Sequence, residues 1–141
     1  MLAEQAASIG EVPVGAIVVA DGQVIGEGFN RPIESSDPTA HGEIVAMRNA
    51  AKAMANYRLT GCDLYVTIEP CTMCVGAMVH ARIRRLIFGA PEPRAGALTS
   101  QLALMDAEHF NHRLDWTGGV LEKECSELIK DFFKRRRLPN S

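Results

Sequence analysis

His41-Gly42-Glu43 and Pro70-Cys71-Thr72-Met73-Cys74 are the two stretches around which the chain is organised. The first has the pattern H-x-E and the second the pattern P-C-x-x-C, so together they offer an imidazole, two thiols and a carboxylate. His41, Cys71 and Cys74 are good zinc ligands, and three protein ligands leave one tetrahedral position for water, which is typical of a catalytic zinc. We therefore expect the fold to bring the two stretches together.

The spacing of the two cysteines predicts a helix. Cys71 and Cys74 share one face of a helix, and Pro70 suits its first position, where the missing N–H has no consequence. The positive end of that helix favours the thiolate form that a metal needs.

A second helix is expected to start near His41. Asp37-Pro38-Thr39 has the pattern of a helix start, with Thr39 as the N-cap. On a helix His41 and Glu43 point to nearly opposite sides. Both can therefore serve one site only if a zinc ion lies above the N-termini of the two helices.

Length and composition describe one globular domain, expected to span residues 1–141. A chain of 141 residues can bury a substantial core. No apolar run approaches the roughly 18 residues of a membrane helix, and Glu4 and Glu11 at a start without basic residues argue against a signal peptide. Four cysteines, two of them in a metal motif, favour a reducing compartment, so we expect a cytoplasmic protein with no membrane partner.

Basic residues form two clusters in a chain whose formal net charge is only −2. They are Arg82, Arg84, Arg85 and Arg94, and the run Lys134-Arg135-Arg136-Arg137. Without a further observation, such a run is read as a solvated helix end that complements the helix dipole.

The apolar periodicity predicts a mixed α/β domain. We expect strands over 12–20, 23–29, 63–68 and 85–88, and helices over 2–9, 41–54, 71–81, 102–106 and 123–137. The first two strands form a hairpin at Asp21-Gly22, Gly89 closes the fourth, and the strand–helix–strand unit implies a parallel pair. The result is a three-layer α/β/α domain whose mixed sheet starts as an antiparallel hairpin.

Two helices have a predicted buried face. In the helix expected over 41–54, the buried face consists of Met47, Ala50, Ala51 and Met54. In the helix expected over 123–137, the buried face is the stripe Cys125, Leu128, Ile129, Phe132 and Phe133.

Glycine and proline residues mark the connections between these elements. Gly26-x-Gly28 is not a nucleotide loop, because Arg31 stands where a third glycine is needed and no helix follows directly. Residues 30–36 are expected to be a polar loop. The stretch 91–96, with two prolines, predicts a stiff loop at a strand end, where ligands bind in α/β sheets.

The residues of the two motifs suit hydrolytic deamination. Zinc lowers the pKa of bound water to about 7, and Glu43 can take a proton from that water and deliver protons to a ring nitrogen and a leaving amine. The carbon attacked would be C4 of cytosine or C6 of a purine. A peptidase is disfavoured, because H-x-E is not H-E-x-x-H.

Two alternatives use the same cysteines differently. A structural zinc would need a fourth ligand from the set Cys62, His80, His109, His112 and Cys125. A redox pair would use Cys71 and Cys74 alone. Neither explains Glu43 or the joint occurrence of the two motifs, which is the signature of zinc nucleobase deaminases.

The chain resembles the bacterial tRNA-specific adenosine deaminases of the TadA type, in the cytidine/deoxycytidylate deaminase superfamily, over nearly its whole length. The resemblance is carried by Glu11-Val12-Pro13-Val14-Gly15-Ala16, Gly28-Phe29-Asn30-Arg31-Pro32, Asp37-Pro38-Thr39-Ala40-His41, Leu64-Tyr65-Val66-Thr67-Ile68-Glu69-Pro70-Cys71, Gly76-Ala77-Met78, Asn111-His112-Arg113 and Phe132-Phe133-x-x-Arg136-Arg137. The last two are more telling than the zinc motif, which free-base and nucleotide deaminases share.

This resemblance implies a cytidine-deaminase-like α/β/α sandwich with a mixed five-stranded sheet, forming a single CMP/dCMP-type zinc deaminase domain. It implies one zinc per chain and hydrolysis of the wobble adenosine of an arginine tRNA to inosine, with release of ammonia, by a cytosolic homodimer. The partner is the anticodon stem-loop.

The resemblance also implies roles for individual residues. Asn30 would hydrogen-bond the flipped-out adenine, and Phe133, Arg136 and Arg137 on the C-terminal helix would contact the anticodon arm. Glu92 would lie beside the nucleotide preceding the target adenosine, where a carboxylate can accept a hydrogen bond from a ribose 2′-OH.

The chain departs from the family pattern in three places. Gly42 replaces the usual alanine, Pro91 and Pro93 flank Glu92 where an aspartate with less proline is usual, and the N-terminal helix is a turn or two short, as in a chain with a truncated or misassigned start. The alternatives are a guanine or other free-base or nucleoside zinc deaminase, and an RNA-binding module with a structural zinc. Glu43 argues against the second.

Overall fold

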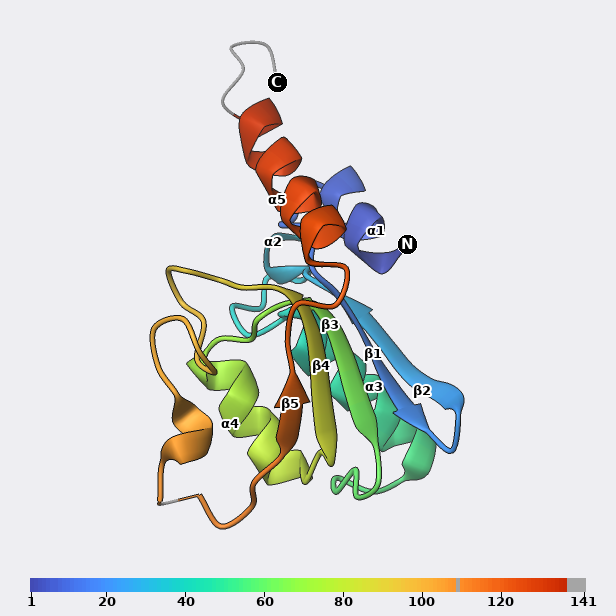
Figure 1. The fold of residues 1–141 in the computed structure, drawn as a ribbon. Helices are drawn as coiled ribbons and strands as arrows, with labels where there is room; N and C mark the ends of the chain where they lie inside the picture. The colour runs from blue at the N-terminus through green and yellow to red at the C-terminus, as the bar shows by residue number, and fades with distance from the viewer. Residues whose placement is uncertain (109, 137–141) are drawn as a thin grey trace.

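The computed structural model describes residues 1–108 and 110–136, and a five-stranded mixed sheet lies at its centre (Figure 1). The strands are β1 (Gly15–Ala20), β2 (Gln23–Phe29), β3 (Asp63–Ile68), β4 (Arg85–Ala90) and β5 (Asp115–Thr117), in the order β2-β1-β3-β4-β5. β1 is antiparallel to β2 and β3, whereas β3, β4 and β5 are parallel. The predicted hairpin, parallel pair and mixed sheet are confirmed.

Helices lie on both faces of this sheet. They are α1 (Leu2–Ser8), α2 (Pro32–Ser35), α3 (Gly42–Met54), α4 (Thr72–Ala81) and α5 (Glu122–Arg136), with one 3₁₀ turn at Leu104–Asp106. Figure 1 shows α3 and α4 behind the sheet, whereas α1 and α5 pack together at one end of its other face. The α/β/α layering is confirmed, but its second helical layer covers only part of the sheet.

The main core lies between the sheet and the α3–α4 layer. Val18, Leu64 and Leu86 form one row across β1, β3 and β4 and are fully buried. Met47 and Met78 contribute from the helical side of the same core. Burial of each such side chain stabilises the fold by about 1.5–3 kcal/mol, and this core holds the starts of α3 and α4 in place.

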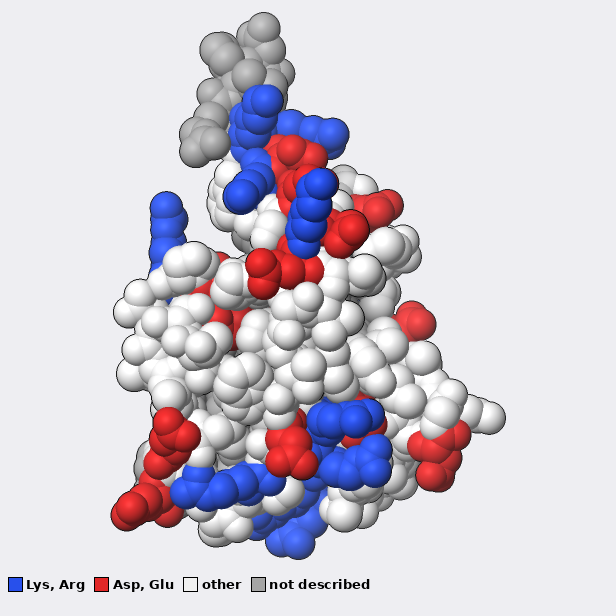
Figure 2. Space-filling view, viewed as in Figure 1, with Lys and Arg blue, Asp and Glu red and all other residues white. Residues whose placement is uncertain are grey.

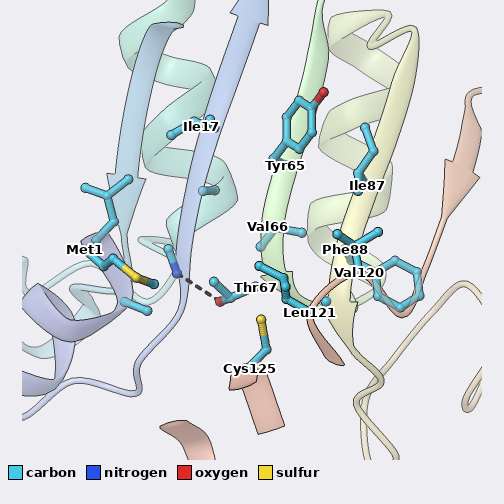
Figure 3. A pocket seen from close by; sticks show the side chains of 15 residues that line it. Met1, Ile17, Tyr65, Val66, Thr67, Ile87, Phe88, Val120, Leu121 and Cys125 are labelled. Carbon is cyan, nitrogen blue, oxygen red and sulfur yellow. Dashed lines mark hydrogen bonds between the residues drawn. The ribbon is translucent and has the colours of Figure 1, made fainter. Parts of the chain in front are cut away.

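An apolar groove of about 400 Å³ occupies the other face (Figure 3). Ile17, Tyr65 and Ile87 form its row across the sheet, and Leu121 and Cys125 border it from the side of α5. The residues of the H-x-E and P-C-x-x-C motifs do not line this groove.

Two strand boundaries differ from those expected. β1 begins at Gly15 rather than at residue 12, because Pro13 has no N–H to give to a ladder. Gly89 does not close β4 but lies within it, and a Cβ there would come 2.5 Å from Cys125 Sγ. Gly89 is therefore needed for the close approach of α5 and not for ending the strand.

The helices differ from the expectation in smaller ways, and α1 ends at Ser8 rather than at residue 9. The loop expected over 30–36 contains α2, which Pro32 can start because a first-turn residue needs no N–H. The helix expected over 102–106 is only the 3₁₀ turn, and α5 begins at Glu122. Met54 is 40% exposed rather than buried, because it lies at the last turn of α3.

The stripe predicted on α5 is only partly covered. Its members up to Phe132 are half-buried, whereas Phe133 is 45% exposed. Within the residues that the structure describes, no helix combines the length and apolar character needed to cross a membrane.

Candidate active site

His41 and Cys71 occupy the same position on two different helices. His41 is the N-cap of α3 and Cys71 is the N-cap of α4, both with extended backbone. Thr39 is therefore not the cap as expected, and its hydroxyl donates instead to Asp37 Oδ1 at 2.7 Å. Pro70 likewise precedes the cap and does not take the first helical position.

The two helix starts bring three ligand atoms together. His41 Nδ1 lies 3.7 Å from Cys71 Sγ and 3.6 Å from Cys74 Sγ, and all three atoms lie within 4.8 Å of one another. One imidazole nitrogen and two thiolate sulfurs form a donor set that suits zinc. The positive ends of α3 and α4 favour the thiolates. These residues therefore fit a metal ion with an open coordination position.

The thiols and the imidazole also affect each other's protonation. Hydrogen bonds from Cys74 and from His41 lower the pKa of Cys71 to about 4. The partnership with Cys71, together with burial, raises the pKa of Cys74, and the hydrogen bond with Cys71 raises that of His41. A metal ion binds cysteine as the thiolate and histidine as the neutral imidazole, so its binding at this cluster would release the protons that these groups carry.

Glu43 is a buried carboxyl group beside this cluster. It is 3% exposed and lies in the first turn of α3. Burial raises its pKa above the ordinary value, and nearby His41 opposes the shift. A raised pKa brings a carboxyl group closer to the working range of a general acid–base, which must both take up and return a proton.

Asn30 is anchored next to the same helix start. Its backbone N–H donates to Val14 O at 3.0 Å, and its side-chain Oδ1 accepts the backbone N–H of Gly42 at 2.7 Å. With its oxygen committed to Gly42, the Asn30 amide can donate further hydrogen bonds through its NH₂ group. Such a donor is complementary to an acceptor atom on a nucleobase.

Glu92 lies half-buried in the loop that follows β4. Its backbone N–H donates to Glu69 Oε1 at 3.1 Å, and its own Oε1 accepts the backbone N–H of Arg94 at 2.9 Å. One oxygen of the Glu92 carboxylate is thus committed to the loop itself.

Glu69 is the residue that sequence reasoning missed. In the sequence Glu69 stands out only as part of a stretch that resembles the family, yet it is 2% exposed and accepts hydrogen bonds from the loop 91–100. Burial acts to raise the pKa of Glu69, but bonds from Ser100, Thr99 and Glu92 hold it below the usual value. A glutamate directly after an apolar strand and before Pro-Cys was the available signal.

The C-terminal helix carries the candidates for RNA contact. α5 stands beyond the carboxyl ends of the parallel strands (Figure 1), and its surface mixes basic and acidic side chains (Figure 2). Arg136 donates to Gly10 O at 3.0 Å and lies over the Phe132 ring, 5.4 Å from its centroid. Arg137 lies outside the described residues.

The described residues that could have supplied a fourth metal ligand lie outside the cluster. Among the described residues, the metal-binding group contains only His41, Cys71 and Cys74. Cys62 Sγ lies 3.8 Å from Met54 Sδ, and His112 Nε2 lies 2.8 Å from Ile83 O. Neither joins the group, nor do His80 and Cys125, and His109 is outside the described residues.

Asn111-His112-Arg113, part of the family resemblance, makes structural contacts. Asn111 accepts from Arg82 at 3.3 Å, and Arg113 donates to Ala107 O at 2.9 Å. With the His112 bond to Ile83, these contacts fix the long connection that precedes β5.

Comparison with known proteins identifies the family. The MafB19-like deaminase family matches residues 1–137. A tRNA-specific adenosine deaminase of Haemophilus influenzae is 53% identical over 137 residues, which are 96% of this chain and 79% of that protein. The chain belongs to the tRNA-specific adenosine deaminases.

Solved structures agree with this assignment. One from a study of A-to-I editing by tRNA:A34 deaminases at the wobble position has a TM-score of 0.88 and 45% identity, covering 90% of this chain and 92% of the other. A guanine deaminase of Bacillus subtilis has a TM-score of 0.65 and 32% identity, and the match covers 99% of this chain and 90% of the other. The expected cytidine-deaminase-like fold is confirmed. Of these two structures, the tRNA:A34 deaminase is more similar to this chain than the guanine deaminase is.

Proposed function

We propose that this enzyme hydrolyses the wobble adenosine of tRNA to inosine with release of ammonia, using one zinc ion held by His41, Cys71 and Cys74. The observation that carries the proposal is the convergence of these ligands at two helix N-termini beside buried Glu43. The family membership and the likeness to the tRNA:A34 deaminase structure support the choice of substrate.

The chemistry divides between the metal and the protein. When bound, zinc supplies a Lewis acid that makes water nucleophilic near neutral pH. Glu43 takes one proton from the attacking water and delivers it to the purine ring nitrogen as the hydroxyl adds to C6. It then takes the remaining proton of that hydroxyl and gives it to the amine, so that the C6–N bond breaks, C6=O forms and ammonia leaves. The Asn30 NH₂ group donates to the base and so orients C6 toward the ligand cluster. The net reaction consumes one water and releases one ammonia.

The substrate is the anticodon stem-loop, with arginine tRNA as the expected species. Phe133, Arg136 and Arg137 would contact the RNA from the C-terminal helix. Arg136 would exchange the carbonyl of Gly10 for a phosphate, which is a stronger acceptor for a guanidinium. Glu92 would accept the 2′-OH of the preceding nucleotide. We also propose a homodimer, because a stem-loop is large relative to one such chain. A tRNA substrate is consistent with a location in the cytoplasm.

The test uses purified protein and synthetic stem-loops. A stem-loop with a wobble adenosine should be converted to inosine, whereas the same loop with guanosine at that position and free guanine should stay unchanged. The protein should contain one zinc per chain. Efficient guanine turnover without inosine formation in RNA would overturn the proposal.

A further inference from the structure

The loop formed by residues 91–100 is folded around one buried carboxylate. This carboxylate belongs to Glu69, and it accepts five hydrogen bonds from the loop. The donors are the backbone N–H groups of Glu92 at 3.1 Å, Leu98 at 3.0 Å, Thr99 at 2.9 Å and Ser100 at 3.0 Å, and the Ser100 hydroxyl. The donors come from the start and from the end of the loop. One side chain therefore fixes both ends at once.

The same segment is joined directly to the ligand cluster. Glu69 precedes Pro70-Cys71, and the N–H of Ala97 donates to Pro70 O at 2.9 Å. On the other side, the Glu69 N–H donates to Ala90 O, at the end of β4. The distance between the Cys71 end of the site and Glu92 is thus set through Glu69 and its neighbours.

Gly96 shows how tightly the loop fits this carboxylate. A Cβ at Gly96 would lie 2.3 Å from the carboxyl carbon of Glu69 and 2.4 Å and 2.5 Å from its two oxygens. Such distances are well inside van der Waals contact. The loop can close over Glu69 only because residue 96 has no side chain.

We infer that Glu69 is a positioning residue, which holds the 91–100 loop and its Glu92 against the nucleotide beside the target adenosine. It contacts neither substrate nor metal, and it acts through the loop. The inference rests on the proposed function, since that function supplies the nucleotide that Glu92 faces.

Glu69→Gln is the main test, because the amide keeps the size of the carboxylate but cannot accept from all five donors. The loop amides of Leu98, Thr99 and Ser100 should exchange hydrogen about tenfold faster or more. The kcat/KM for the stem-loop should fall roughly 10- to 100-fold, mainly through KM, as expected when a binding group is displaced. Zinc should stay at one per chain.

Asp63→Asn is the matched control. Asp63 is also a buried acid of the same segment, but it lies at the opposite end of β3 and pairs with Arg84 and Arg85. This variant should lose stability without any change in loop exchange, zinc content or KM. A common rise of KM in both variants would mean that Glu69 is only a stability residue, and the inference would fail.

Gly96→Ala and the double variant Glu69→Asp/Gly96→Ala test the same contact from the other side. The added methyl should raise KM by displacing the loop, and the shorter aspartate should make room for it, so the double variant should recover part of the affinity. Independent, additive losses would contradict the packing argument. If Glu69→Gln does not fold, Ser100→Ala removes a single donor and should give a milder rise in KM.

The two proposals fail in different ways. If the wild-type protein makes no inosine in RNA, the proposed function fails, whereas exchange at the loop amides still reports whether Glu69 holds the loop. If wild-type turnover is present but Glu69→Gln leaves KM at the wild-type value, only the positioning role is lost.

Discussion

The side-chain oxygen of Asn30 accepts a hydrogen bond from the backbone N–H of Gly42 at 2.7 Å. Gly42 lies between His41 and Glu43, so this bond ties the proposed base-binding residue to the segment that carries a proposed metal ligand and the proposed proton-transfer group. It also commits the amide oxygen of Asn30, which leaves the NH₂ group as the part of the side chain that can donate.

Asn30→Asp tests that orientation. The carboxylate can keep the bond to Gly42 but has no NH₂ to donate. Zinc content should be unchanged, and kcat/KM on the stem-loop should fall roughly 10- to 100-fold, in line with the loss of one good hydrogen bond. Steady-state kinetics measures this, and wild-type turnover by the aspartate variant would show that the NH₂ group plays no part.

Glu43→Gln should separate binding from chemistry. The amide fills the same buried space but cannot transfer a proton. Deamination should fall by roughly 10²–10⁴-fold, as for other proton-transfer groups, while zinc content and stem-loop affinity persist. Single-turnover inosine formation and fluorescence anisotropy measure the two properties. Near-normal turnover would contradict the assigned role.

The four cysteines should divide into two classes. Cys71→Ser should lose zinc, because it removes one of three ligand atoms, whereas Cys62→Ser and Cys125→Ser should keep one zinc per chain, since neither thiol joins the group. Metal analysis of the purified variants decides this. A zinc-free Cys62→Ser protein that still folds would revive the structural-zinc alternative.

Gly28→Ala should destabilise the fold. A Cβ at this position in β2 would lie 2.5 Å from both Ala46 N and Gly42 O of α3, so strand and helix would have to separate. Overpacking of this kind costs about 1–3 kcal/mol. Gly76→Ala in α4 is the control, because nothing lies within 4 Å of its added Cβ and alanine favours the helix. Chemical denaturation compares the two, and equal stability of both variants would refute the close-packing explanation.

Asp63 should give the protein a pH-dependent stability. A hydrogen bond from Arg84, aided by Arg85, lowers the pKa of Asp63 in the folded state. A lowered folded-state pKa stabilises the fold above the unfolded value of about 3.9, and this contribution disappears as pH falls through the folded value. The stability difference between wild type and Asp63→Asn should therefore be full near pH 6 and shrink in acid. Thermal melts across this range measure it, and a constant difference would contradict the ion-pair explanation.

Local signals in the sequence were enough for most of the framework. Asp21-Gly22 predicted the first hairpin, and apolar alternation predicted β2 and β3 with the bounds that they have. The joint motif predicted that His41, Cys71 and Cys74 would be needed together, and the structure places their ligand atoms within 4.8 Å. Turn chemistry and side-chain period depend on neighbours along the chain, which is why these features can be read from the sequence.

Tertiary contacts decided the remainder. Gly89 had the pattern of a strand end, but it lies inside β4 because Cys125 packs against it. Thr39 had the pattern of an N-cap, but the helix starts after His41 and Thr39 bonds to Asp37. Glu69 could not be paired in advance with Ser100, which lies 31 residues away in sequence. Close approaches and the partners of buried charges depend on residues that only the folded chain brings together, so the sequence alone does not determine them.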